Sequence, residues 1–344
     1  MATFLKQSKF IISTDPGDVP ADESAEDLME AGPEQELRQF AVPDSQHAQR
    51  LDRVLASLIP EFSRSYLQQG VESGLVTLNS VVVTKCALRL RAGDQVTVEL
   101  RPTPQTQAFK PEPMPLEVVF EDPHLLVINK PAGLVVHPAP GNWSGTLLNG
   151  LLARDPGACL LPRAGIVHRL DKDTSGLMVV ARSRQAMDAL VQRIAAREVS
   201  RQYLALGHRR WTGPEFRQVE APVGRDPRNR LRMAVVDLSR NAGKSASTGI
   251  RLLQNGEHGC LVECTLQTGR THQIRVHMAS LGHPLVADVL YGGAPAAGLA
   301  RQALHAFRLA FNHPVTGQSL AFAAPLPPDI RAALQAWGLG YNDN

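Results

Sequence analysis

A segment rich in proline, threonine and glutamine, RPTPQTQAFKPEPMP (residues 101–115), divides the chain into two regions with different hydrophobic patterns. This composition favours an extended linker over a packed element. With 344 residues, the chain is long enough to form two domains, each with its own core. The linker therefore restricts the possible folds to a small first domain and a larger second one.

The region before the linker predicts a small unit of two helices followed by strands. Four apolar residues have helical spacing: Leu51, Val54, Leu55 and Leu58. Ser63 can cap a second helix that ends at Gly70. The segment GLVTLNSVVVTKCALRLRAGDQVTVEL then predicts short strands with turns at Asn79-Ser80 and Gly93-Asp94.

The region after the linker contains more predicted strands than helices. The segment LEVVFEDPHLLVINKP indicates a hairpin that turns at Asp122-Pro123. Further strand candidates are GLVVHP, GLMVVAR, RQYLALG and GCLVECTLQT. Helices are predicted from two apolar stripes, one formed by Met187, Leu190, Val191 and Ile194, the other by Ile274, Met278 and Leu281. Because strands and helices do not alternate regularly, we predict an α+β fold with a central mixed or antiparallel sheet flanked by helices.

Charge is distributed unevenly along the chain. Residues 1–36 hold nine acidic residues and two lysines, so residues 37–344 hold 34 basic and 24 acidic residues, a net charge of +10. We therefore expect residues 1–44 to be an acidic disordered tail. The basic remainder favours nucleic acid as a partner, although arginine-rich surfaces also occur in ordinary enzymes.

The sequence offers little support for a membrane segment, a disulfide framework or a metal site. No apolar run reaches the roughly 20 residues that a membrane helix needs. The four cysteines are too scattered for a zinc ribbon or disulfide framework, and Cys260 and Cys264 are expected to be buried thiols on one strand face. His272 and His277 are five residues apart, which does not place them on one helix face as ligands. These features favour the reducing cytoplasm.

Two short stretches resemble ligand-binding loops in part. The stretch DKDTSG, beginning at Asp171, matches the opening of a calcium loop, but its twelfth position is Arg182 instead of a carboxylate. The stretch NAGKSAST (241–248) lacks the earlier glycine of a phosphate loop, since that position is Leu238. Neither calcium nor ATP binding is predicted.

The remaining candidate for chemistry is Asp171, which precedes a predicted strand and follows Arg169. A second arginine-rich stretch, GRTHQIR, covers residues 269–275. A carboxylate among guanidinium groups stays ionised and is suited to act as a nucleophile or base. From the residues alone, a structural Arg-Asp pair explains the pattern equally well.

Two family resemblances decide between these alternatives. Residues 45–108 resemble the S4 RNA-binding domain, with SR near the second helix, G-x-V-x-x-N, Lys85 and GD. The stretch HRLDKDTSGLMVVAR resembles the central motif of the RluA family of pseudouridine synthases. Other family motifs follow in order: VINKPAGLVVHP, REVSRQYLA, GKSAST, LQTGRTHQIRVHMASLGHPLVAD and RQALHA. The S4-like region places the chain nearest to the D-type members of the family, which act on large-subunit ribosomal RNA.

The resemblance implies a catalytic domain at residues 109–344 that isomerises uridine in 23S ribosomal RNA without cofactor or metal. It assigns Asp171, Tyr203 and Arg275 to catalysis, and Lys130 and His137 to the pocket wall. The residues expected to bind RNA are Arg169, Arg270, His272, Arg64 and Lys85. The protein is expected to act as a cytoplasmic monomer with no membrane partner. The alternatives are a transfer-RNA pseudouridine synthase and a non-catalytic RNA-binding or ribosome-assembly factor on the same fold.

Overall fold

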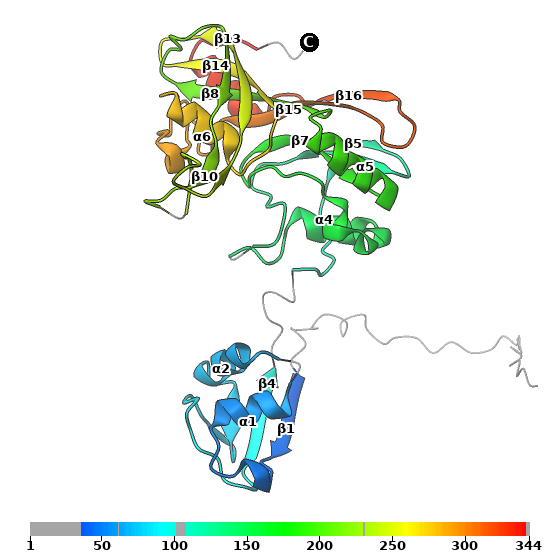
Figure 1. Ribbon diagram of the computed structural model, residues 1–344, viewed down its shortest axis with the longest axis vertical. Helices are drawn as coiled ribbons and strands as arrows, with labels where there is room; N and C mark the ends of the chain where they lie inside the picture. Colours follow the sequence, from blue (N-terminus) through cyan, green and yellow to red (C-terminus); the bar gives the residue numbers. More distant parts are fainter. Residues whose placement is uncertain (1–35, 61, 101–107, 140, 230, 342–344) are drawn as a thin grey trace, which may run out of the picture. The chain divides into compact units, whose positions relative to one another are not determined.

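A computed structural model describes residues 36–60, 62–100, 108–139, 141–229 and 231–341. It divides into two compact units, one ending at Pro102 and one beginning at Thr103 (Figure 1). None of the helices in these described ranges is both long and apolar enough to cross a bilayer.

The first unit packs two helices against a four-stranded sheet with the strand order β1-β4-β2-β3. Its elements are β1 (Glu36–Ala41), α1 (Leu51–Leu58), α2 (Arg64–Glu72), β2 (Val76–Leu78), β3 (Val81–Val82) and β4 (Gln95–Leu100). Ser63 caps α2 by accepting a hydrogen bond from the backbone N–H of Tyr66, as predicted. The two predicted turns are also present, since β2 joins β3 at Asn79-Ser80 and β4 follows Gly93-Asp94.

Both predicted boundaries of this unit need correction. Glu36–Ala41, which was assigned to the acidic tail of residues 1–44, forms β1 and pairs antiparallel with β4. Residues 1–35 of that tail lie outside the described residues. At the other end, Ala108 is 3% exposed and its carbonyl accepts a hydrogen bond from Asn149 of the second unit. The predicted limit at residue 108 is therefore too late, because Ala108 packs with the second unit.

The second unit is built on a nine-stranded mixed sheet, which confirms the predicted α+β class. Eight strands follow the order β5-β6-β7-β15-β8-β14-β13-β9, and β16 pairs with β15. Their bounds are β5 (Glu117–Glu121), β6 (Leu125–Lys130), β7 (Ser175–Ala181), β8 (Ser200–His208), β9 (Phe216–Glu220), β13 (Ser247–Asn255), β14 (Gly259–Leu266), β15 (Leu304–Asn312) and β16 (Ser319–Ala323). A separate three-stranded sheet contains β10 (Val223–Arg225), β11 (Met233–Val235) and β12 (Gly243–Lys244).

Helices cover both faces of the large sheet, and successive residues along a strand pack into different cores. Tyr203 of β8 packs in one core with Ile274, whereas its neighbour Leu204 packs in another core with Ile330. The first core includes residues of α4 (Leu147–Arg154) and α6 (Gln273–Ser280). Residues of α7 (Pro328–Ala336) belong to the core that contains Leu204, and residues of α5 (Arg184–Ala195) belong to a third core; these two cores contain the alternate strand residues.

The strands at the centre of the sheet position the loop that carries Asp171. β7 and β15 pair in parallel, through Gly176 and Ala306. Gly176 has φ +116°, and a Cβ there would lie 2.2 Å from the carbonyl oxygen of Ala306. Glycine is therefore required at position 176, where the chain leaves the TSG turn and enters β7.

Several sequence predictions can be compared with these elements. The hairpin at Asp122-Pro123 and the buried thiols Cys260 and Cys264 are confirmed. The predicted strand GLVVHP (133–138) is wrong, because these residues form turns and bends. Gly133 has φ +87° and donates its N–H to the carbonyl of Lys172, so its backbone is committed to a loop contact. The helix predicted to end at Gly70 continues to Glu72.

Candidate active site

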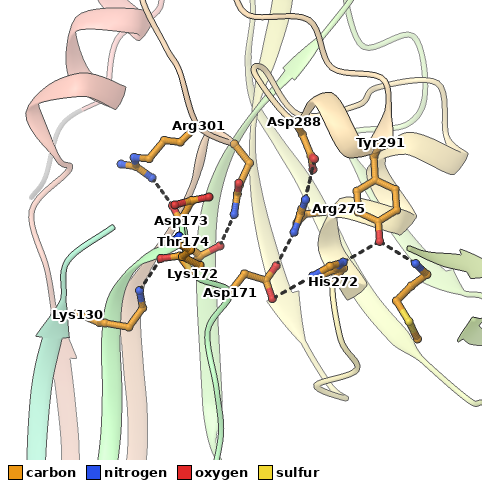
Figure 2. A network of polar contacts seen from close by, with 12 residues as sticks. Lys130, Asp171, Lys172, Asp173, Thr174, His272, Arg275, Asp288, Tyr291 and Arg301 are labelled. Atoms are coloured by element: carbon orange, nitrogen blue, oxygen red, sulfur yellow. Dashed lines mark hydrogen bonds and ion pairs between the residues drawn. The ribbon is translucent and has the colours of Figure 1, made fainter. Parts of the chain in front are cut away.

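Asp171 lies in a loop whose backbone is held by surrounding side chains. The carbonyl of Asp171 accepts a hydrogen bond from the N–H of Thr174, which closes a turn. Lys130, fully buried in β6, donates from Nζ to the carbonyl of Lys172 at 3.0 Å, and also to two carbonyls of its own loop. From the opposite side, Arg301 donates to the carbonyl of Asp173 at 2.9 Å (Figure 2). These contacts fix the loop around Asp171.

Burial lowers the pKa of Lys130 to about 7, although the nearby charges of Asp173 and Asp171 act in the opposite direction. Three carbonyl oxygens surround its Nζ, which matches the three N–H donors of a charged ammonium group. Lys130 therefore supports the loop from beneath, and it is not among the residues that line the cleft, where the resemblance had placed it.

Arg275 joins Asp171 to a second carboxylate, Asp288. Its Nη1 donates to Oδ2 of Asp171 at 3.0 Å, while Nε and Nη2 donate to the two oxygens of Asp288 at 2.7 and 2.8 Å. The Arg275 side chain is 8% exposed, that of Asp288 1% and that of Asp171 15%. Although burial opposes its charge, hydrogen bonds and attraction to the two carboxylates raise the pKa of Arg275 further. The guanidinium is therefore a permanent positive charge beside Asp171.

His272 and Tyr291 complete this network. Nδ1 of His272 hydrogen-bonds the Tyr291 hydroxyl at 2.8 Å, and its Nε2 lies 3.8 Å from Oδ1 of Asp171. The Tyr291 hydroxyl also accepts the backbone N–H of Met233, and its ring lies 4.9 Å from the guanidinium carbon of Arg275. Burial lowers the pKa of His272, so the ring is neutral at pH 7. Asp171 thus faces one cation and one neutral imidazole.

Asp171 opens into a cleft of about 780 Å³ on the face of the sheet that α6 covers. Tyr203 of β8 lines the cleft and is 4% exposed. Burial raises the pKa of Tyr203 to about 12, with Asp171 acting in the same direction and Arg201 opposing it. A neutral, rigid aromatic side chain therefore shares the cleft with the charged Asp171–Arg275 pair.

Arginines dominate the charge of the cleft. Asp171 is its only acidic lining residue within the described ranges, whereas six arginines line it: Arg163, Arg169, Arg197, Arg201, Arg270 and Arg275. Arg169 is exposed, and Arg270 donates to the carbonyl of Ser245 at 3.1 Å. His272 immediately precedes α6, as the sequence predicted. The cleft is therefore suited to a polyanion.

The two residues expected to bind RNA in the first unit differ in their environment. Arg64 donates to the buried Asp52 at 2.5 Å, although 46% of its side chain stays exposed. Arg50 and Gln68 also bond Asp52, and these contacts lower the pKa of its carboxyl against the effect of burial. Arg64 thus stabilises the fold of this unit, while Lys85 is exposed.

Sequence reasoning missed Asp288, Tyr291, Arg201 and Arg301. The motif LQTGRTHQIRVHMASLGHPLVAD ends at Asp288, but the resemblance suggests no role for that residue. An acid within the apolar run PLVADVLY was a usable signal, because a buried carboxylate requires a partner. Arg201 and Arg301 lie within the motifs REVSRQYLA and RQALHA, but the residues around them in the sequence did not indicate a role.

Comparison with known proteins supports these structural observations. A family profile described as RNA pseudouridylate synthase matches residues 124–280, and an S4 domain profile matches residues 49–96. The ribosomal large subunit pseudouridine synthase D of Neisseria meningitidis serogroup B is 48% identical over 292 residues, which covers 82% of this chain and 76% of the relative.

Two further proteins show the same relationship. The protein of the same name from Xanthomonas campestris is 47% identical over 329 residues, covering 92% of this chain and 96% of the relative. Among solved structures, human RNA pseudouridylate synthase domain containing 1 superposes with a TM-score of 0.51 at 28% identity, covering 64% of this chain and 90% of that one.

Proposed function

Because the chain belongs to the RNA pseudouridylate synthase family, we propose that it isomerises uridines of large-subunit ribosomal RNA to pseudouridine, with Asp171 as the catalytic carboxylate. The observation that carries this proposal is the pairing of Asp171 with Arg275 at 3.0 Å in an arginine-rich cleft. The reaction breaks the C1′–N1 bond of uridine, turns the detached uracil and forms a C1′–C5 bond, while C5 loses its proton and N1 gains one.

Asp171 acts as a nucleophile on the sugar or the base, or as the base that removes a sugar proton. Each of these routes needs an ionised carboxylate that is partly shielded from water. The guanidinium of Arg275 donates a hydrogen bond to the carboxylate at 3.0 Å and stabilises its negative charge. The turn closed by Thr174 and the contact from Lys130 to the next peptide hold Asp171 in place.

Tyr203 is the proposed platform for the uracil ring. It lies in the same cleft as Asp171, and burial keeps its hydroxyl protonated at neutral pH. An aromatic ring of this kind stabilises an extruded base by stacking, worth about 1–3 kcal/mol per base. We propose that its hydroxyl also handles a proton of the base.

The target uridine must leave its stack to enter the cleft, which costs a few kcal/mol. Arg169 neighbours the Asp171 loop and is exposed, so we propose that it fills the vacated space or binds a phosphate. Arg270 and His272, just before α6, contact the RNA backbone in this proposal. The S4 unit, through Lys85 and the exposed part of Arg64, adds affinity and site selection.

The assignment to large-subunit ribosomal RNA rests on the names and identities of the relatives and on the S4 domain. A transfer-RNA pseudouridine synthase would use the same catalytic residues and is the second candidate. A non-catalytic assembly factor is less well supported, because Asp171, Tyr203 and Arg275 all line one cleft. We further propose that the protein acts as a cytoplasmic monomer.

The decisive experiment maps pseudouridine by carbodiimide modification and sequencing of RNA from a deletion strain. Complementation with the wild-type chain is expected to restore specific large-subunit pseudouridines, and complementation with Asp171→Asn to leave them as uridine. Loss of pseudouridine from transfer RNA alone would support the second candidate. Full restoration by Asp171→Asn would disprove the catalytic role.

A further inference from the structure

Arg201 of β8 carries a buried guanidinium that no other side chain neutralises within the described residues. The residue is 5% exposed, and its Nε is buried without a hydrogen-bond partner. Removing a charged group from water without a partner is unfavourable. Such a group becomes favourable only when a bound anion neutralises its charge.

The surroundings of Arg201 explain why the protein itself does not supply that anion. Asp171 is the only carboxylate lining the cleft within the described ranges, and it is already bound to Arg275. Among the residues that the structure describes, Arg275 has two carboxylate partners, whereas Arg201 has none. The contrast between these two arginines, both lining the cleft, indicates that Arg201 is reserved for a ligand.

A second orphaned donor, His168, lines the same cleft. Its Nε2 accepts the backbone N–H of Val179 at 3.1 Å, which places the remaining ring proton on Nδ1. That Nδ1 is buried and has no partner. Burial, aided by the charge of Arg201, lowers the pKa of His168 to about 3, so the ring is a neutral donor. Of the four orphaned buried side-chain atoms in the described chain, two therefore lie at this cleft.

The loop before α6 leaves room for the Arg201 side chain. A Cβ on Gly269 would lie 3.0 Å from Nη1 of Arg201, so any larger residue there would press on the guanidinium. Arg201 and Tyr203 are two residues apart on β8, and their side chains therefore point to the same face. A nucleotide whose base contacts Tyr203 would bring its phosphate close to Arg201.

We propose that Arg201 and His168 form a binding subsite for a backbone phosphate of the RNA, next to the nucleotide that contacts Tyr203. This inference rests on the proposed function. A phosphate supplies the missing negative charge, and its oxygens match the planar fork of guanidinium donors. A uracil carbonyl would accept a hydrogen bond but would leave the buried charge uncompensated.

The test compares Arg201→Met with Arg251→Met in the full chain. Arg251 is an exposed arginine of β13 outside the cleft, so it is a matched control for the loss of one positive charge. Binding of an unmodified transcript of large-subunit ribosomal RNA is measured against salt concentration. For Arg201→Met we expect affinity to fall about tenfold or more. The slope of log K against log salt should decrease by about 0.7–0.9 relative to Arg251→Met.

Thermal unfolding of the RNA-free variants separates a binding role from a structural one. Replacing an uncompensated buried charge by an apolar side chain of similar length is expected to raise the Tm. Failure of Arg201→Met to fold would overturn the subsite, because the guanidinium would then serve the protein's own stability. An unchanged salt slope would overturn it too. Tritium release by the wild-type chain tests the proposed function separately, since RNA binding does not require isomerisation.

Discussion

Asp288 holds the guanidinium of Arg275 with two hydrogen bonds, of 2.7 and 2.8 Å, and leaves Nη1 to contact Asp171 at 3.0 Å. One cation is thereby shared between two carboxylates, and its orientation is set by the one that lies deeper. Asp288 follows α6 in the chain and lines no part of the cleft among the described residues. Its contribution to Asp171 passes through Arg275.

The first prediction concerns the ion pair between Asp288 and Arg275. Asp288→Asn keeps the shape of the side chain but removes the charge that orients Arg275, so we expect kcat to fall about tenfold or more. Breaking a buried pair should also lower the free energy of unfolding by about 3 kcal/mol. Asp188→Asn is the control, because its pair with Arg184 is exposed on α5 and should contribute less than about 1 kcal/mol. Single-turnover rates and urea unfolding measure both effects.

The second prediction separates the two aspartates of the central motif. Asp171→Asn should abolish release of tritium from RNA labelled at uridine C5 while leaving RNA affinity nearly intact. Asp173 contributes a backbone carbonyl to Arg301, so Asp173→Asn should lower the rate only partly. Wild-type activity of Asp171→Asn would rule out the proposed mechanism.

The third prediction compares Arg275→Met with Arg270→Met. The Arg275 variant leaves Asp171 and Asp288 without a cation, which should cost about 3–5 kcal/mol. Without the guanidinium that contacts Asp171, the single-turnover rate should fall sharply, and the free energy of unfolding should decrease as well.

Arg270→Met provides the contrast. The side chain of Arg270 bonds only the Ser245 carbonyl among the described residues and does not contact Asp171. Its loss should weaken RNA binding and make the salt dependence shallower, with little change in the single-turnover rate. The measurements are the single-turnover rate and the salt dependence of RNA binding for both variants. A normal single-turnover rate for Arg275→Met would show that this arginine does not support Asp171.

The fourth prediction concerns acid sensitivity. Burial lowers the pKa of His305 to about 4, and its Nδ1 bonds Ser175 at the start of β7. In the unfolded chain the pKa is about 6.5, so the unfolded state binds more protons between pH 6.5 and 4. Stability is therefore full above pH 6.5 and falls as the pH drops, by about 2–3 kcal/mol at pH 4.5.

Urea unfolding at pH 7 and pH 4.5 measures this loss. His305→Gln should unfold more easily at pH 7 but show a smaller difference between the two pH values. His258→Gln, which changes an exposed histidine of the same unit, should keep the wild-type difference. Equal pH dependence of His305→Gln and wild type would show that another group causes the acid sensitivity.

The fifth prediction concerns the S4 unit. Because the two compact units divide at Pro102 and Thr103, removal of residues 1–102 should leave a folded second unit with Ala108 still in place. This truncated chain should retain its chemistry but lose affinity and site selection, which lowers kcat/KM on a ribosomal RNA fragment. An unchanged kcat/KM would contradict the proposed role of the S4 unit.

Elements with local signals could be predicted from the sequence alone. Three examples are the helical spacing from Leu51, the Ser63 cap and the turn at Asp122-Pro123. Each of these signals spans only a few residues, so backbone preference and periodicity were enough to identify it. Asp171 could likewise be singled out, because its neighbours in the chain form a dense motif and resemble a known family.

Contacts between residues far apart in the chain depend on the tertiary structure and could not be predicted from local signals. Arg275 meets Asp171 across 104 positions, and Arg301 reaches the loop of Asp173 across 128. The segment GLVVHP does not form the predicted strand for the same reason, because the N–H of Gly133 donates to the carbonyl of Lys172, a residue distant in the chain. Burial depends on all elements packing together, and only the packed chain leaves Arg201 buried and without an anion. Such charges and contacts follow from the sheet that brings distant segments together.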